Sequence, residues 1–172
     1  MIEFGVRIDM GSGKQSFRAK LNRLAGYLQK EAETAIKEMA ELYYEILISH
    51  IGEYRGGMVF PDVSWQPLSQ KWLAAKRLSG WTEEIWEATG GIKGSIRIFG
   101  LETKGDTISI FVGLKDVPLD ILLKAMKNEF GLGIPDRPLF EPSKRYLLTN
   151  THYRAMISTA LKKAANAAVG KF

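Results

Sequence analysis

The chain has 172 residues, of which 45% are hydrophobic and 25% are charged, with a net charge of +5 and no cysteine. These values are typical of a soluble globular protein, and we expect a single domain over residues 1–172. The absence of cysteine excludes disulfides, thiolate zinc sites and cysteine nucleophiles.

The N-terminal segment alternates between apolar and polar residues. Residues 2–8 read Ile-Glu-Phe-Gly-Val-Arg-Ile, and period two over this length indicates a half-buried strand. A charged, alternating segment is not a secretory signal. No window holds the roughly 18 uninterrupted apolar residues of a membrane helix. We therefore expect a protein that begins in the cytoplasm and has no membrane partner.

A long run of helical spacing follows, from about Lys14 to Ile51. Gly26 leaves open whether this run forms two helices or one bent helix. One stripe of apolar residues at steps of three and four predicts an amphipathic helix: Phe17, Leu21, Leu24, Leu28, Ala32, Ala35, Met39, Leu42 and Ile46. A stripe of this length needs a sheet or a neighbouring chain to cover it.

The middle of the chain predicts short elements. Residues 52–65 are rich in glycine and aromatic residues and are expected to form a loop, and a short helix is expected over 69–78. Residues 95–99 and 107–112 are β-branched and alternating, which is typical of strands. The turn residues at 104–106 between them predict a hairpin.

The C-terminal part is predicted to be mostly helical. Pro118 opens a short helix that ends at about Phe130. Residues 131–138, rich in glycine and proline, form the next loop. A final helix is expected from about Ser143 to Val169, ending at Gly170.

The sequence carries no pattern of a catalytic, cofactor or metal site. Residues 11–14, Gly-Ser-Gly-Lys, invite comparison with a phosphate-binding loop, but Ile8 and Gln15 stand where that motif needs glycine and serine or threonine. His50 and His152 lack the spacing of metal ligands. The serines lack a nucleophile elbow. We therefore expect no enzyme, no metal and no cofactor.

Four tryptophans fall within a short stretch: Trp65, Trp72, Trp81 and Trp86. They fit two interpretations equally, as core anchors or as buried anchors of a protein interface. Base stacking on these rings would require a cationic groove beside them. Lys71, Lys76 and Arg77 lie near in sequence, so a basic nucleic-acid-binding module is the alternative function, although no motif supports it. The spread of the basic residues along the chain favours a solvated surface.

Three segments, in order over about residues 60–165, resemble the phage virion-morphogenesis family, which includes Mu-like tail-completion proteins and their tail-joining relatives. The first is Trp65-Gln66-Pro67-Leu68-Ser69 followed by Lys76. The second is Thr89-Gly90-Gly91-Ile92-Lys93-Gly94-Ser95-Ile96. The third is Glu129-Phe130-Gly131 followed by Ile134-Pro135-Asp136-Arg137-Pro138-Leu139-Phe140.

The resemblance implies an α+β fold in which a long N-terminal helix and a C-terminal helix pack on a small antiparallel β-sheet. It also implies a non-enzymatic subunit that self-associates into a ring, at the end of a phage tail or at the head–tail junction. Other tail or connector proteins would be its partners. Such a protein is expected in the virion, and in the host cytoplasm during assembly.

The third segment supports the idea of a shaped contact loop. Its prolines fix their own φ angles and bias the preceding residues toward extended geometry. The planar fork of Arg137 suits a carboxylate or a carbonyl. The equally weighted alternative is a rigid linker with Arg137 tied to a local acid. The expected contact residues are Trp65, Leu68, Phe130, Pro135, Arg137, Pro138, Leu139 and Phe140.

Overall fold

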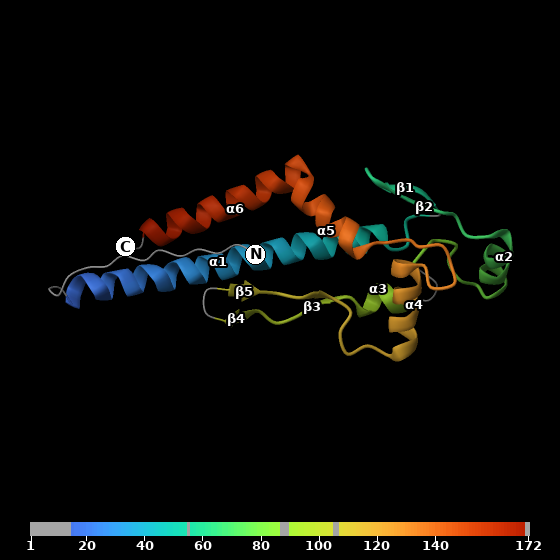
Figure 1. The fold of residues 1–172 in the computed structure, drawn as a ribbon, viewed down its shortest axis with the longest axis horizontal. Coiled ribbons are helices and arrows are strands. Elements are labelled where there is room, and N and C mark those ends of the chain that lie inside the picture. The colour runs from blue at the N-terminus through green and yellow to red at the C-terminus, as the bar shows by residue number, and fades with distance from the viewer. Residues whose placement is uncertain (1–14, 55, 87–89, 105–106, 171–172) are drawn as a thin grey trace. The chain divides into compact units, whose positions relative to one another are not determined.

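The structure, a computed structural model, describes residues 15–54, 56–86, 90–104 and 107–170 (Figure 1). The predicted strand at residues 2–8 and the segment 11–14 lie outside these residues. The predicted α+β class is confirmed: about 57% of the chain is helical, and three antiparallel sheets have two strands each. Within the described residues, no helix is both long enough and apolar enough to cross a membrane.

Helix α1 (Gln15–His50) runs without a break and confirms the predicted long helix. Gly26 lies inside it, so the possibility of two helices is settled in favour of one. A Cβ atom at Gly26 would meet nothing within 4 Å, and a single exposed glycine costs only about 1 kcal/mol relative to alanine. The contacts of the chain define two compact units. Residues up to Ala40 belong to the first unit, and residues from Glu41 onward lead into the second. The single domain expected over residues 1–172 stays a prediction.

The first unit contains the start of α1, residues 99–111 and α6 (Thr151–Gly170). Strand β4 (Glu102–Lys104) pairs antiparallel with β5 (Thr107–Ser109). The Thr103 hydroxyl donates to a Glu33 carboxylate oxygen at 3.3 Å, which ties β4 to α1. This pairing is the outer part of the predicted hairpin, which is therefore confirmed.

The second unit contains the end of α1 and the remaining elements. These are β1 (Gly57–Phe60), β2 (Val63–Trp65), α2 (Gln70–Leu78), α3 (Gly91–Ser95), β3 (Arg97–Ile98), β6 (Val112–Gly113), α4 (Leu119–Phe130) and α5 (Phe140–Thr149). Strand β3 pairs antiparallel with β6 and forms the base of the predicted hairpin. The core is built from large side chains that are almost completely buried: Leu47, Ile51, Trp65, Ile85, Ile96 and Leu139.

Residues 57–65 form a hairpin where the sequence analysis predicts a loop. Strand β1 pairs antiparallel with β2, with an irregular register between Met58 and Phe60. Val59, Phe60 and Trp65 are buried. The signal for the hairpin is present, because short β-branched and aromatic runs flank the turn-forming pair Pro61 and Asp62. The glycines around these runs favour a loop, so the sequence alone does not reveal the hairpin.

The single final helix predicted from Ser143 to Val169 is wrong, because two helices occupy this region. Helix α5 begins earlier, at Phe140, and α6 begins at Thr151. Between them Asn150 adopts extended backbone angles, φ −64° and ψ 127°. Asparagine is a weak helix former because its side chain competes for backbone hydrogen bonds. The periodic pattern therefore continues across a residue whose backbone leaves the helix.

The two predicted short helices are confirmed, and each has a recognisable terminus. The Ser69 hydroxyl accepts a hydrogen bond from the Trp72 N–H and caps α2. Helix α4 ends at Gly131, which adopts φ +69°. A Cβ atom at Gly131 would lie 3.1 Å from the Cβ and N atoms of Asp136, whereas one at Gly133 (φ +78°) would meet nothing within 4 Å.

These two glycines predict a measurable difference in stability. Either alanine substitution strains a left-handed backbone, at about 1–2 kcal/mol, but Gly131→Ala also crowds Asp136. We expect Gly131→Ala to lower the free energy of unfolding more than Gly133→Ala, as measured by urea denaturation. Equal losses would show that the chain does not approach closely at Gly131.

Candidate functional site

The loop at residues 131–138 joins α4 to α5 inside the second unit and contains most of the third resemblance segment. It folds back on the helix before it, because the backbone N–H of Arg137 donates to the Asn128 carbonyl at 2.6 Å. Together with the turn at Gly131, this bond fixes the path of the loop at both ends.

Arg137 is an internal cross-link of this loop. Its side chain is only 3% exposed, and its Nε donates to the Gln66 carbonyl at 2.9 Å. One terminal nitrogen donates to the Pro135 carbonyl at 3.3 Å. Burial lowers the pKa of the guanidinium, while the charge of Asp136 opposes that shift. The guanidinium therefore binds carbonyls of its own chain, as its planar fork allows.

Two tryptophans hold the same loop from other directions. Trp65 is 1% exposed, and its indole N–H donates to the Pro138 carbonyl at 3.0 Å. Trp86 is buried, and its indole N–H donates to the Arg137 carbonyl at 2.8 Å. Trp86 has φ +66°, a left-handed conformation that costs about 1–2 kcal/mol for a residue with a Cβ atom. Its burial and its hydrogen bond stabilise that conformation.

A half-buried polar group completes the attachment of α5. Leu139 stands at the N-cap position and offers no polar side chain. Glu129 supplies the missing cap. One of its carboxylate oxygens accepts hydrogen bonds from the backbone N–H of Leu139, at 2.8 Å, and from that of Phe140, at 3.3 Å. Burial raises the pKa of Glu129, although these N–H groups act to lower it. The last residues of α4 thus cap the first turn of α5.

Tyr43, near the end of α1, also contacts the start of α5. Its hydroxyl donates to the Phe140 carbonyl at 2.8 Å. Burial, and after it the negative charges of Glu129 and Glu141, raise the pKa of Tyr43. The tyrosine therefore stays protonated and remains a hydrogen-bond donor.

The structure sorts the eight predicted contact residues by exposure. Trp65, Arg137 and Leu139 are buried. Within this chain the three fill the core or bond to its backbone, and a place for them at or beside a partner contact stays a prediction. Partly exposed are Leu68, Pro138 and Phe140, and exposed are Phe130 and Pro135. For these five, contact with a partner stays a prediction.

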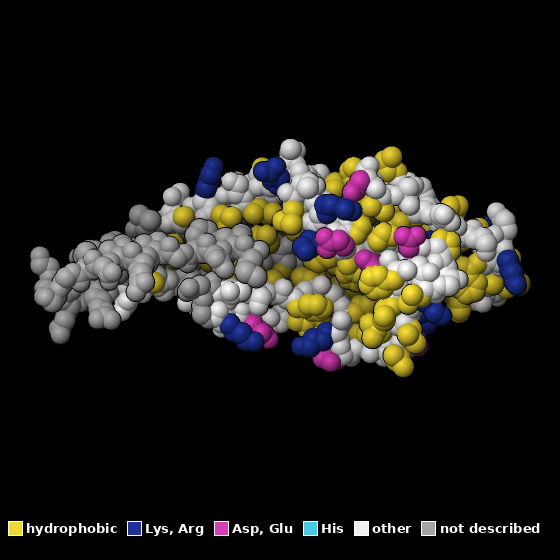
Figure 2. All heavy atoms as spheres, in the orientation of Figure 1, with side chains coloured by type: hydrophobic (Ala, Val, Ile, Leu, Met, Phe, Trp, Pro, Cys, Tyr) yellow, Lys and Arg dark blue, Asp and Glu magenta, His cyan; other side chains and the backbone are white. Residues whose placement is uncertain are grey.

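The surface near the loop is apolar. Phe130 is 66% exposed, Leu132 51% and Ile134 39%. Figure 2 shows hydrophobic side chains gathered on the surface over the region of α4. We call Phe130, Leu132, Ile134 and Pro135 the loop surface. The same short segment therefore buries Arg137 and exposes these apolar groups, with the exposed Asp136 beside them.

The residues that support the loop were only partly visible in the sequence. Trp86 belongs to the tryptophan-rich stretch, but no local pattern indicates its bond to Arg137. Glu129 belongs to the third resemblance segment, and nothing in that segment indicates a helix cap. Tyr43 lies 97 residues from its partner, so no local signal indicates it. Of the four tryptophans, Trp65 and Trp86 are core residues, and Trp72 and Trp81 are partly exposed.

Other polar residues of the described chain form no metal cluster. Within the described residues, no group of three or more histidines, aspartates or glutamates could hold a metal ion. The ring of His50 stacks on Tyr54 and Phe60, with centroids 5.4 and 4.4 Å away. Its Nδ1 lies 2.7 Å from the Ile46 carbonyl oxygen. These contacts make His50 a structural residue.

Comparison with protein-family models, with curated proteins and with solved structures finds no match to this chain.

Because Arg137 cross-links the loop, we expect its replacement to lower the stability of the fold substantially. Arg137→Ala leaves two carbonyls without their donor and opens a cavity, so we expect the free energy of unfolding to fall by about 2–4 kcal/mol. The control is Arg145→Ala, because Arg145 forms an exposed ion pair with Asp62 at 3.1 Å. Exposed pairs contribute about 0–1 kcal/mol. Urea denaturation followed by tryptophan fluorescence measures both, and similar losses would contradict the cross-link.

The half-buried Glu129 predicts that stability depends on pH. Because burial raises its pKa in the folded state, the folded chain binds this proton more tightly than the unfolded chain. The contribution of Glu129 to stability is therefore full below the ordinary glutamate pKa. It is lost as the pH rises through the raised value.

We test this by denaturation of the wild type and Glu129→Gln between pH 4 and pH 7. The stability of the wild type relative to Glu129→Gln should fall as the pH rises across this range. Glu53→Gln, which changes an exposed glutamate of the same unit, should keep the wild-type profile. A wild-type stability that rises relative to Glu129→Gln over this range would refute the assignment.

Proposed function

We propose that the chain is a non-enzymatic assembly subunit of a phage-type tail-completion or head–tail joining ring. The observation that carries this proposal is that the three resemblance segments meet within one unit. In the first segment, the Trp65 indole N–H donates to the Pro138 carbonyl of the third, and the Gln66 carbonyl accepts from Arg137 Nε of the third. Helix α3, from the second segment, contacts α4, which ends in the third. Segments far apart in sequence thus build one structural feature.

That feature suits protein docking better than catalysis. A catalytic site needs polar side chains that converge on a position where a substrate can lie. Around this loop, Arg137, Glu129 and Tyr43 instead bond to backbone groups inside the unit. The exposed groups are mainly the apolar ones of the loop surface, with Asp136 beside them, and exposed apolar groups of this kind often mark interaction sites.

The rigidity of the loop supports the same conclusion. Binding costs free energy for every segment that must become ordered, so a preorganised loop binds more tightly than a mobile one. Here the prolines and the buried Arg137 fix the loop in the isolated chain. In a ring, the loop surface of one copy would meet a different surface of the next copy, because rings arise from heterologous contacts that close by rotation. Tail or connector proteins would occupy the ring's faces, in the virion and in the host cytoplasm during assembly.

Deletion of the gene from the phage or prophage that carries it tests this function. We expect heads and tails that fail to join, seen by electron microscopy, and a loss of infectious particles of at least a hundredfold. Wild-type protein supplied in trans should restore joining. The double variant Leu132→Ser and Ile134→Ser should not, although it folds, because it removes the apolar groups of the loop surface.

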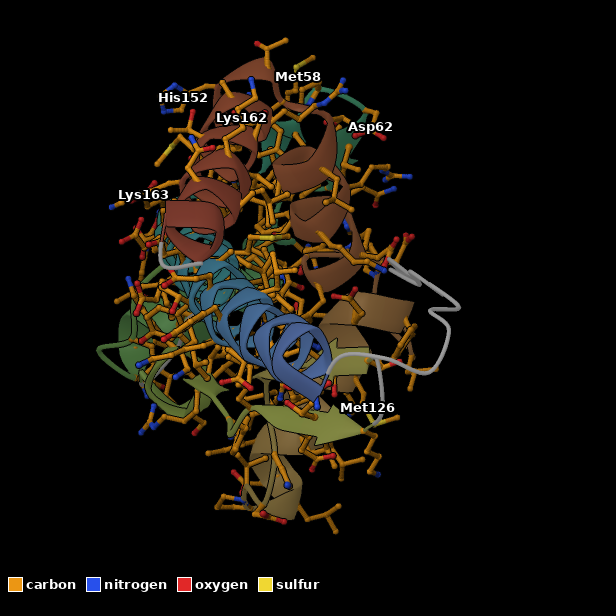
Figure 3. The ribbon with its side chains drawn as sticks, turned by 90° about the vertical axis from the view of Figure 1, so that its left-hand side faces the viewer. Met58, Asp62, Met126, His152, Lys162 and Lys163 are labelled. Carbon is orange, nitrogen blue, oxygen red and sulfur yellow. The ribbon has the colours of Figure 1, made fainter. Side chains whose placement is uncertain are left out.

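The matched control is Met58→Ser, which changes a 73% exposed side chain on the β1–β2 hairpin of the same unit (Figure 3). This variant should restore joining like the wild type. A deletion strain that still produces normal infectious particles would contradict the proposal. So would a gene that lies far from any capsid, connector or tail-tube gene.

A further inference from the structure

Helix α4 carries an exposed apolar stripe. Its members and their exposed fractions are Leu119 68%, Leu122 37%, Leu123 45%, Met126 37% and Phe130 66%. Steps of three and four place them on one face of the helix. Ala125, which lies beyond one edge of this face, is buried. In Figure 3, Met126 lies at the outside of the drawn side chains. We call these five residues the α4 stripe.

The stripe is large for a surface left in water. Its five side chains expose on the order of 450 Å², and Leu132 and Ile134 bring the total to on the order of 600 Å², the upper end of what monomers usually expose. A specific protein interface buries roughly 800 Å² on each partner. The stripe with a polar rim around it therefore supplies the area that one such interface needs.

The charges beside the stripe indicate what covers it. Lys124 of α4 pairs with Asp120 of the same helix at 3.1 Å and lies beside it. Asp120 lies in the first turn of α4 and Lys127 in the last turn. They are seven residues apart, so they lie on the same flank of the stripe. A two-fold axis perpendicular to the helix reverses its direction but keeps this flank on the same side. Each Asp120 then meets Lys127 of the other copy. Parallel helices related by a two-fold axis would place the charged flanks on opposite sides.

We infer that the α4 stripe is an interface between two copies of this chain, with the two α4 helices antiparallel. In this pair Leu119 lies opposite Phe130 of the second copy, and Leu123 lies opposite Met126 near the two-fold axis. The two most exposed side chains thus cover each other. Antiparallel helix dipoles add a favourable interaction, and the two pairs of Asp120 and Lys127 fix the direction.

This inference requires only the α4 stripe and does not rest on the proposed phage function. The two surfaces share Phe130, however. A two-fold contact uses the same patch on both copies and cannot by itself build a ring. The two-fold pair is therefore the state of the chain before it joins an assembly. It must separate before Phe130 can contact another surface.

Sedimentation equilibrium of the full chain over a hundredfold range of concentration tests the pair. The wild type should pass from monomer to dimer, and Leu123→Glu should raise the dissociation constant at least tenfold. The matched control is Leu78→Glu, because Leu78 is 91% exposed on α2, outside the stripe. Its dissociation constant should stay within twofold of the wild type. Circular dichroism checks folding, and Met126→Glu replaces Leu123→Glu if that variant unfolds.

Cysteine cross-linking tests the direction, since the chain has no cysteine of its own. A mixture of Leu119→Cys and Phe130→Cys chains should form a disulfide-linked heterodimer on oxidation. Neither variant alone should cross-link efficiently. Efficient cross-linking of Leu119→Cys alone would overturn the antiparallel arrangement.

Two outcomes would overturn the pair itself. One is a wild type that stays monomeric at all concentrations, which would mean that another segment of the same chain covers the stripe. The other is a dimer that Leu123→Glu and Met126→Glu leave unchanged, which would place the contact elsewhere. Neither outcome bears on the deletion experiment, so the phage proposal and the pair succeed or fail separately.

Discussion

The second unit depends on a buried guanidinium that bonds to backbone carbonyls. Removing an ion from water costs several kcal/mol in a protein interior, so Arg137 is tolerated only where its N–H groups find acceptors. The acceptors found are the carbonyls of Gln66 and Pro135. Both lie at defined positions only if the chain after β2 and the loop after α4 adopt the observed path. The requirement to satisfy this cation therefore selects one loop conformation. Trp65 and Trp86 add to it by donating to the carbonyls of Pro138 and of Arg137 itself.

The same constraint separates the inside of the α4–α5 connection from its outside. Glu129 points inward and caps α5, while the next residue, Phe130, is 66% exposed. Neighbouring residues on a helix are about 100° apart, so a helix that buries Glu129 must turn Phe130 away from it. The polar contacts that hold the loop and the apolar residues that it exposes therefore lie on opposite sides of the same turn. A change that releases Arg137 or Glu129 would also move the surface offered to a partner.

The sequence revealed the elements whose signals are local. The helical spacing of α1, the short helix predicted over 69–78 and the helix that Pro118 opens all rest on neighbouring residues, and these helices are confirmed. The break at Asn150 was missed because the apolar period continues across it. From the sequence, Arg137 could bind either a partner or a local acid. The structure shows a third case, because its main acceptor is a backbone carbonyl 71 residues away. No side-chain pattern reports such an acceptor. Trp65 was equally ambiguous, because tryptophan anchors cores and interfaces alike.

Phe130 links the two proposed contacts and makes them mutually exclusive. A dimer that hides the α4 stripe protects a free chain from nonspecific association, but a very tight dimer would block assembly. The composition of the stripe fits a weak, reversible contact. Its apolar area without the polar rim is below that of a standard interface, and the flanking Asp120 and Lys127 are exposed residues, whose ion pairs contribute about 0–1 kcal/mol each. A binding free energy that is 1.4 kcal/mol more favourable lowers a dissociation constant tenfold. A partner surface that also covers Leu132 and Ile134 therefore needs only slightly more favourable binding to displace the second copy of the chain. The balance between pair and ring is then set by the concentration of the surface that receives the loop.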